Sequence, residues 1–468
     1  MKHAQRLEHD LLGERQVPAD AYWGIHTLRA LENFAITGKP IGSYPDLVKA
    51  LALVKLAAAH ANLDLGDLDA ARHDAIATAC REIVGGQLHD QFVVDVIQGG
   101  AGTSTNMNAN EVIANRALEL MGHAKGDYAV LHPINHVNMS QSTNDVYPTA
   151  LRVAACFGIL GLLAAMAELR LAFAAKAEEF RDILKIGRTQ LQDAVPMTLG
   201  QEFSTYAVML GEDEQRLSEA MALIREVNLG ATAIGTGINT DVDYARLAIA
   251  HLSSLSRLPL EPAPNMIEAT QDTGAFVQLS GVLKRIAAKL SKTCSDLRLL
   301  SSGPQGGFNE INLPERAAGS SIMPGKVNPI IPEVVNQIAF EVIGNDITIT
   351  MASEHGQLQL NAFEPIMGHS LFKSIEHLKA GCHTLTRNCV VGITANRELL
   401  AERARKSAGL ATALNPHIGY ENATRVALES LRTGRSVAEL VLEMGLLDQA
   451  TLETILRPEV LTAPRPRR

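Results

Sequence analysis

The sequence predicts a mainly α-helical protein built around long helices. Aromatic residues make up only 4% of the chain, and the long segments are rich in Ala and Leu, which favour helix over sheet. From Thr149 to about Phe180 there is no proline, and Gly158 and Gly161 are the only glycines. This stretch can therefore form one helix of about thirty residues.

Three further stretches have the same character. They run from Leu199 to Asn228, from Asn265 to Leu300, and from Pro332 to Glu354, the last interrupted only by Gly344. Helices of this length that are apolar around most of their circumference must be buried on several sides, in a bundle or at a subunit interface. We therefore expect a central bundle of long helices and an oligomer.

Length and composition indicate a folded protein of several domains. The chain has 468 residues, of which 46% are hydrophobic and 20% charged, and a prior of about 150 residues per domain suggests roughly three. After about Asn396 the segments shorten and glycines become frequent. We predict an N-terminal helical domain over residues 1–140, a central bundle over 141–396 and a small C-terminal helical domain over 397–468.

Charge and cysteine usage exclude several classes of partner. The net charge of -9 is the wrong sign for a nucleic-acid partner. Five cysteines without a CxxC pair disfavour a disulfide framework, and the charged N-terminal segment lacks the apolar core of a secretory signal. The most apolar run, Val153 to Met166, is 14 residues long, too short to cross a bilayer. We expect a cytoplasmic protein with no membrane partner.

Polar loops precede several of the predicted helices. Segment Gly102–Asn110 reads GTSTNMNAN and leads into an apolar-periodic run, where Asn108 and Glu111 have the spacing of a capping pair. Segments NMSQSTND and GRTQLQDAVP are also rich in polar residues and also precede predicted helices. Ser, Thr and Asn are ordinary capping residues, but a helix start with surplus hydroxyls and amides is also suited to bind a carboxylate or phosphate. Composition alone leaves both interpretations open.

A long loop between Gly303 and Gly325 holds five glycines and three prolines and ends in GSSIMPGKVNP. Such loops within helical chains usually act as lids or binding loops. It is not a P-loop, because Gly319 to Gly325 is one residue too long and Val327 replaces the Ser or Thr. His132 and His136 are four residues apart, but Pro133 and the lack of HExxH disfavour a zinc pair.

Four of these segments together resemble the fumarase/aspartase superfamily: GTSTNMNANEV, HVNMSQSTND, GRTQLQDAVP and GSSIMPGKVNP. The resemblance covers nearly the whole chain. It implies a mainly α, three-domain superfamily fold whose central helices form the core of a homotetramer, with each active site shared by three subunits.

Smaller differences indicate a branch of the superfamily. QSTND, Gln190 where fumarases usually carry His, and GQLQLNAFEP are similar to the aspartate ammonia-lyases. The resemblance implies reversible deamination of L-aspartate to fumarate and ammonia, with class II fumarate hydratase as the alternative. A non-catalytic structural protein and a phosphate-binding NTPase are the remaining hypotheses; the loop spacing above disfavours the last.

The resemblance also assigns roles to residues of this chain. Removing a Cβ proton from aspartate creates a doubly charged aci-carboxylate, which preorganised donors must stabilise. Ser320 matches the general base, Lys326 and Asn328 match residues that bind the α-carboxylate, and the reaction requires no organic cofactor or specified metal. The remaining matches are Thr103, Ser142 and Thr143 for the β-carboxylate, and Asn144, Thr189 and Gln190 for the amino group.

Two positions depart from the superfamily pattern. The family usually has Lys where this chain has Met139, and Arg where it has Gln305. Both differences remove positive charge close to a predicted site for a dianionic substrate. They imply weaker substrate binding or a shifted substrate preference.

Overall fold

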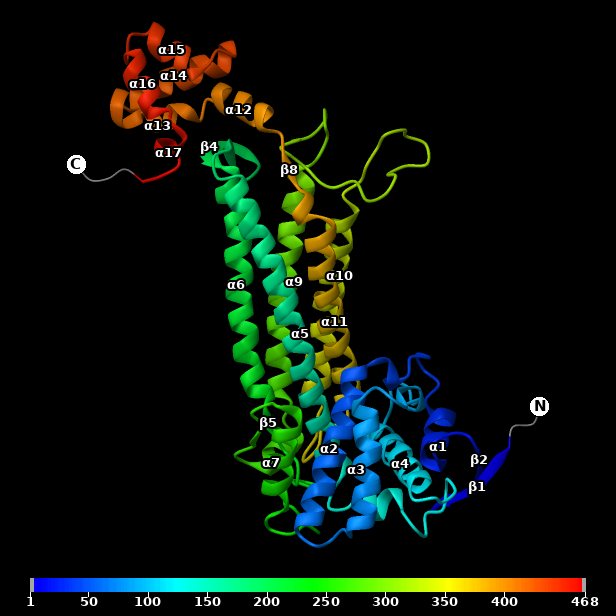
Figure 1. Cartoon of the computed structure of the whole chain (residues 1–468). Coiled ribbons are helices and arrows are strands. Elements are labelled where there is room, and N and C mark those ends of the chain that lie inside the picture. The colour runs from blue at the N-terminus through cyan, green and yellow to red at the C-terminus, as the bar shows by residue number, and fades with distance from the viewer. Residues whose placement is uncertain (1–3, 465–468) are drawn as a thin grey trace. The chain divides into compact units, whose positions relative to one another are not determined.

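Five long helices dominate the computed structural model, which describes residues 4–464 (Figure 1). They are α5 (Thr143–Glu179), α6 (Leu199–Ile224), α9 (Gly274–Leu300), α10 (Ile330–Glu354) and α11 (Glu364–Asn388). The predicted mainly α fold with long helices is confirmed. The basic C-terminal stretch TAPRPRR, which we expect to be a solvated tail, lies mostly outside the described residues.

Helix α5 begins six residues earlier than predicted and contains Pro148. A proline inside a helix leaves the carbonyl four residues before it without its usual amide donor. Here that carbonyl belongs to Asn144, and the side-chain amide of Asn228 donates to it at 3.1 Å. The helix therefore continues through the proline because a residue far along the chain supplies the missing hydrogen bond.

The predicted single helix from Asn265 to Leu300 is wrong. The structure has a short helix, α8 (Met266–Gln271), followed by α9 from Gly274. Between them Asp272 is extended, and its carboxylate accepts from the amide of Gly274 at 2.9 Å. The Asp side chain thus satisfies a backbone donor locally and favours a break over continued helix.

The described residues fall into two compact units. Unit 1 is drawn from Met1–Leu163, Gln215–Arg285 and Phe340–Leu378, and unit 2 from Ala164–Glu214, Ile286–Ala339 and Lys379–Arg468. Each unit contains part of every long helix. The three-domain division at residues 140 and 396 stays a prediction.

In unit 1, α2 (Pro45–Asp64) is buried along most of its length and packs on α3 (Ala70–Val84) and α7 (Tyr244–Ser256). Its Ala and Leu side chains allow close packing on both neighbours. The unit also contains α1 (Ile25–Asn33) and α4 (Thr103–Leu120), the 3-10 turns Ile41–Ser43 and His89–Gln91, and a π-turn at Pro133–Val137. Its strands pair as β1 (Gln5–Asp10) with β2 (Gly13–Pro18) and β5 (Glu226–Val227) with β6 (Glu261–Pro262).

In unit 2, β3 (Leu184–Thr189) and β4 (Gln192–Thr198) form an antiparallel hairpin, and β7 (Ile311–Asn312) pairs with β8 (Thr394–Ala395). A 3-10 turn, Val390–Gly392, ends α11. The chain then enters a series of short helices with their own apolar core. They are α12 (Arg397–Lys406), α13 (Leu410–Ile418), α14 (Tyr420–Thr433), α15 (Val437–Glu443), α16 (Gln449–Ile455) and α17 (Pro458–Leu461).

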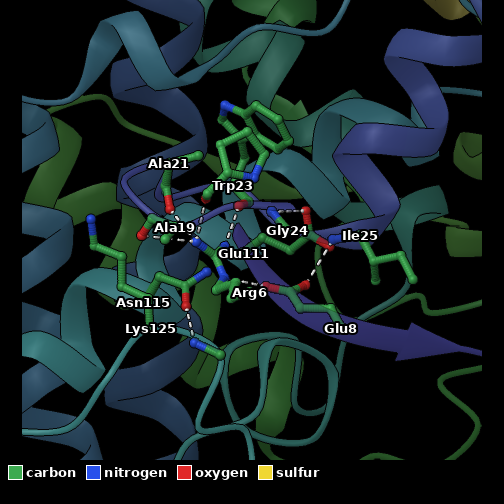
Figure 2. A network of polar contacts seen from close by, with 12 residues as sticks. Arg6, Glu8, Ala19, Ala21, Trp23, Gly24, Ile25, Glu111, Asn115 and Lys125 are labelled. Atoms are coloured by element: carbon green, nitrogen blue, oxygen red, sulfur yellow. Dashed lines mark hydrogen bonds and ion pairs between the residues drawn. The ribbon is translucent and has the colours of Figure 1, made fainter. Parts of the chain in front are cut away.

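The predicted capping pair Asn108–Glu111 is wrong, because α4 already begins at Thr103. Glu111 is buried, and its carboxylate accepts from the backbone amides of Gly24, His26 and Thr27 at 2.8–3.1 Å. Burial raises the pKa of Glu111. Figure 2 shows Glu111 close to Glu8, which accepts from the amide of Ile25. The two acidic side chains therefore satisfy the amide donors at the start of α1.

Among the described residues, only α5 is long and apolar enough to cross a membrane, with a mean hydropathy of 2.0 in its most apolar window. The length of the Val153–Met166 run alone does not exclude a membrane span, because this run belongs to a 37-residue helix. Within the structure 61% of that window is buried. Such burial is the pattern of a helix in the core of a folded protein.

The apolar core of α13 to α16 gives a stability prediction. Leu414 is fully buried there, so Leu414→Ala should lower the local opening free energy of α13, measured by amide hydrogen exchange, by about 2–5 kcal/mol. Leu428 of α14 is 63% exposed, and Leu428→Ala is the matched control, with a change within about 0.5 kcal/mol. Equal effects of the two substitutions would contradict this packing.

Candidate active site

The nine predicted site residues divide between the two units. All are exposed or half-buried within one chain, so their polar groups are available to a ligand. Unit 1 carries Thr103, Ser142, Thr143 and Asn144, and unit 2 carries Thr189, Gln190, Ser320, Lys326 and Asn328.

In unit 1 the structure brings the first turn of α4 to the start of α5. The side-chain amide of Asn106 donates to the hydroxyl of Thr143 at 3.0 Å and to Asn138 at 3.1 Å. Thr103 lies one turn before Asn106 and donates to the carbonyl of Gly100. Two of the polar loops identified in the sequence are thus joined by side-chain hydrogen bonds.

Asp145 fixes the loop that carries Ser142 and Asn144. Its carboxylate is fully buried and accepts from the backbone amides of Ser142, Gly230 and Thr232 at 2.9–3.1 Å. Burial raises the pKa of Asp145 to about 6, while these hydrogen bonds lower it. The buried Asp145 carboxylate thus fixes the backbone next to Ser142 and Asn144. The Asn144 side chain also donates to the carbonyl of Ala233 at 2.7 Å.

Lys55 is a second buried anchor of this loop. Its ammonium group donates to Asn138 at 2.8 Å and to Gln141 at 2.9 Å. Asn138 Oδ1 also accepts from Asn106 and Asn110, so one oxygen links Lys55, α4 and the loop. Burial lowers the pKa of Lys55 to about 7. Sequence reasoning missed this residue, although a lone charge within the apolar run of α2 is a usable signal.

Unit 1 also holds buried polar oxygens that make no hydrogen bond within residues 4–464. They are Asn62 Oδ1, Asn106 Oδ1, Asn110 Oδ1, Thr232 Oγ1 and Tyr244 OH. Buried polar atoms are usually satisfied, and exceptions often mark functional regions. Three of these oxygens belong to Asn106, Asn110 and Thr232, which contact the anchored loop or its supports.

In unit 2, Thr189 and Gln190 lie at the tip of the β3–β4 hairpin. Thr189 pairs with Gln192, so the turn consists of Gln190 and Leu191, with φ of 53° and 63°. Two left-handed residues are typical of a type I′ turn, in which Asn and Gly are usual. The backbone strain of Gln and Leu at these positions is a feature often found at functional sites.

The loop that contains Ser320 is closed by its own polar groups. The hydroxyl oxygen of Ser320 accepts from the backbone amides of Ile322 at 3.2 Å and Met323 at 2.9 Å. Asn328 donates to the carbonyl of Gly319 at 2.7 Å, and the amide of Gly319 donates to the carbonyl of Lys326. The structure therefore brings Ser320 and Asn328 together and presents the exposed Lys326 between them. That the loops of unit 1 and unit 2 meet in one site stays a prediction.

The side chains of His132 and His136 form hydrogen bonds with nearby backbone amides. His132 Nδ1 accepts from the amides of Ile134 and Asn135, and His136 Nδ1 accepts from the amide of His132. These two rings stabilise the π-turn at Pro133–Val137. Among the described residues, no group of three or more His, Cys, Asp or Glu side chains could hold a metal ion.

The predicted site residues are hydroxyl, amide and lysine side chains, and they lie in loops or at helix starts. Residues 13–344 match the family model described as Lyase, and residues 410–463 match that of the fumarase C C-terminus. The chain belongs to this lyase family, within the fumarase/aspartase superfamily.

Proteins of known name match over nearly the full length. The chain is 61% identical to an aspartate ammonia-lyase of Pseudomonas aeruginosa, over 99% of this chain and 98% of that protein. It is 54% identical to an aspartate ammonia-lyase of Escherichia coli, over 99% and 97%.

Solved structures of the superfamily share the fold. A fumarate lyase:delta crystallin from Brucella melitensis bound to cobalt gives a TM-score of 0.96 at 54% identity, covering 98% of this chain and 100% of that one. A class II fumarase from Schistosoma mansoni gives 0.92 at 34% identity, covering 97% and 98%.

Buried Lys55 gives a prediction for stability against pH. Its pKa falls from 10.5 to about 7 on folding, so between these values the unfolded chain holds a proton that the folded chain lacks, and stability rises with pH. Relative to Lys55→Met, the free energy of unfolding of the native chain should rise by up to about 1.4 kcal/mol per pH unit in this window.

Denaturant titrations at several pH values measure this difference. The control Lys406→Met removes a lysine that is 65% exposed and should leave the slope unchanged. Parallel pH profiles for the native chain and Lys55→Met would contradict the lowered pKa of Lys55.

Proposed function

We propose that the protein is an aspartate ammonia-lyase, a carbon–nitrogen lyase that converts L-aspartate reversibly to fumarate and ammonia. The observation that carries this proposal is that the chain is 61% and 54% identical, over nearly its full length, to aspartate ammonia-lyases of two different genera. The residue types at the predicted site agree with it. Gln190 stands where fumarases usually carry His, and an amide can accept from an ammonium group without acting as an acid or base on water.

Ser320 is the proposed base that removes the Cβ proton. A serine hydroxyl is a poor base unless its oxyanion is stabilised. The two backbone amides that donate to Ser320 Oγ favour the oxyanion, because hydrogen bonds to a charged form lower the pKa of the group. The geometry of the loop thus supports the role assigned to this serine.

The carbanion places a second negative charge on the β-carboxylate. Thr103, Ser142 and Thr143 are the proposed donors to it, and each preorganised donor contributes about 3 kcal/mol to the transition state in a site that excludes water. Asp145 and Lys55 support this role, because they fix the loop before the substrate binds. Preorganisation removes the cost of reorienting the donors during the reaction.

The remaining residues bind the two other groups of the substrate. Lys326 supplies the positive charge for the α-carboxylate, and Asn328 orients it. Asn144, Thr189 and Gln190 surround the amino group that leaves as ammonia. The small-molecule substrate is thus held by its three polar groups, each through different loops.

The proposed assembly is a cytoplasmic homotetramer whose active sites are shared by three subunits. Helix α10 supports it, because Phe340, Ile347 and Met351 are 62%, 60% and 58% exposed in the single chain. Their spacing of seven and four residues places them on one face of the helix. Contact with other copies of the chain would bury this apolar row and bring together loops from different subunits.

The proposal is tested by initial rates of fumarate formation, followed by ultraviolet absorbance. Aspartate should give fumarate and malate should not, and Ser320→Ala should lower kcat by about 1,000-fold. Ser321→Ala is the control, because it removes the neighbouring hydroxyl of the same loop and should retain most of the rate. Turnover of malate but not aspartate would identify a fumarate hydratase. A folded tetramer without activity on either substrate would identify a structural protein.

Met139 gives a separate prediction about substrate binding. It lies in the loop held by Lys55, and its carbonyl accepts from Asn62 and Gln141. Met139→Lys should restore positive charge near the dianionic substrate and lower the KM for aspartate by about 10-fold, or about 1.4 kcal/mol. Met139→Leu controls for the change in shape. An unchanged KM in the lysine variant would mean that this side chain does not face the substrate.

A further inference from the structure

Glu310 is a buried carboxylate to which the superfamily motifs assign no role here. It is 1% exposed and forms ion pairs with two cations of strand β3. Lys185 Nζ lies 2.7 Å from Glu310 Oε2, and Arg188 Nη2 lies 2.6 Å from Glu310 Oε1. Lys185 is also 1% exposed and makes a second ion pair with Glu202 at 2.6 Å.

The hairpin is shaped so that both cations reach this carboxylate. Residues three apart on a regular strand point to opposite faces, but the β3–β4 register shifts between Ile186 and Arg188. Such a bulge changes the alternation of side chains. As a result, Lys185 and Arg188 both bind Glu310, and the guanidinium of Arg188 also lies 4.1 Å from the centre of the Phe308 ring.

The backbone around Glu310 is itself fixed. The amide of Glu310 donates to the carbonyl of Leu300 at the end of α9, and its carbonyl accepts from the amide of Asn396 next to β8. Glu310 directly precedes β7 and the segment that leads to Ser320. One rigid residue therefore holds the base of two segments that carry predicted site residues.

The tip of the hairpin has little support of its own. Residues Thr189 to Asp193 are exposed, and Gln190 and Leu191 have left-handed backbone conformations. Arg188 immediately precedes Thr189, so its ion pair with Glu310 is the strong fixed contact nearest to the tip. Where the tip lies thus depends on this ion pair.

We propose that Glu310 is a positioning residue for deamination: through Lys185 and Arg188 it holds Thr189 and Gln190 where the amino group of the substrate binds. This inference rests on the proposed function. It concerns the ammonia end of the reaction, because the hairpin tip carries the residues assigned to that group. Loss of this anchor therefore weakens the binding of ammonia more than the binding of the substrate carboxylates.

The reverse reaction separates positioning from general stability. In Glu310→Gln the KM for ammonium should rise by about 10- to 100-fold, while the KM for fumarate changes much less. Glu168→Gln is the control, because Glu168 also contacts two basic side chains in unit 2, His383 and Arg387. It should leave both KM values unchanged. Equal changes in the two KM values of Glu310→Gln, or no change, would overturn the inference.

Arg188→Gln keeps the buried Lys185–Glu310 pair and tests the same anchor if Glu310→Gln does not fold. It should raise the KM for ammonium selectively as well. If both single variants fold, the double variant should be no more impaired than the more impaired single variant. The reason is that both changes break the same Arg188–Glu310 ion pair. Independent, multiplying effects would count against the shared anchor.

Amide hydrogen exchange distinguishes failure of this inference from failure of the proposed function. Exchange at Thr189 to Gln192 should accelerate in Glu310→Gln and Arg188→Gln and stay unchanged in Glu168→Gln. A native chain that does not form fumarate from aspartate would overturn the proposed function directly. A native chain that does, with unchanged hairpin exchange in both anchor variants, would overturn the positioning role alone.

Discussion

Buried charged side chains fix the loops that carry the predicted site residues, and the rest of the site depends on them. A loop that presents hydroxyls and amides to a ligand has few apolar side chains with which to pack. Such a loop must therefore be held by polar contacts with buried side chains. Asp145 holds the start of α5 through three backbone amides, Lys55 holds the preceding turn, and Glu310 holds the hairpin.

This solution has an energetic cost that apolar packing would avoid. Burying a charge is unfavourable unless it is paired or fully hydrogen-bonded, and well-packed apolar residues are often more stabilising. Burial moves the pKa of Lys55 down and that of Asp145 up, toward their neutral forms. An apolar residue at either position would leave the backbone amides or side-chain oxygens of the loop without a partner. The anchors therefore give definite loop geometry at the expense of stability.

The sequence predicted the helices well because their signal is local. Ala and Leu content and the absence of proline identify α5, α6 and α10 within a few residues. The errors have long-range causes: Pro148 is tolerated because Asn228 donates to Asn144, and Glu111 leaves the local capping role because its partners are Gly24, His26 and Thr27. No window of the sequence contains both members of these pairs.

The candidate site was accessible from the sequence only through its motifs. Local chemistry alone places Ser320 in a Gly- and Pro-rich loop and Thr103 at a helix start. The supporting roles of Lys55 and Glu310 come from partners far along the chain, such as Asn138 and Arg188. Motifs identify groups assigned to the substrate, whereas the groups that hold them in place are found from the folded structure.

The two kinds of loop support have different consequences for the proposed reaction. The donors proposed for the β-carboxylate rest on fully buried anchors, which suits a role that requires fixed dipoles as charge develops. Ser320 instead is half-buried in a mostly exposed loop that is closed by its own backbone and by Asn328. A serine oxyanion is effective as a base only where water is excluded. Because a single chain leaves much of this loop exposed, the loop needs further cover, and other subunits of the proposed tetramer can provide it. Assembly and basicity are then linked in the proposed tetramer, because cover of this loop by another subunit would complete the dry surroundings that Ser320 requires.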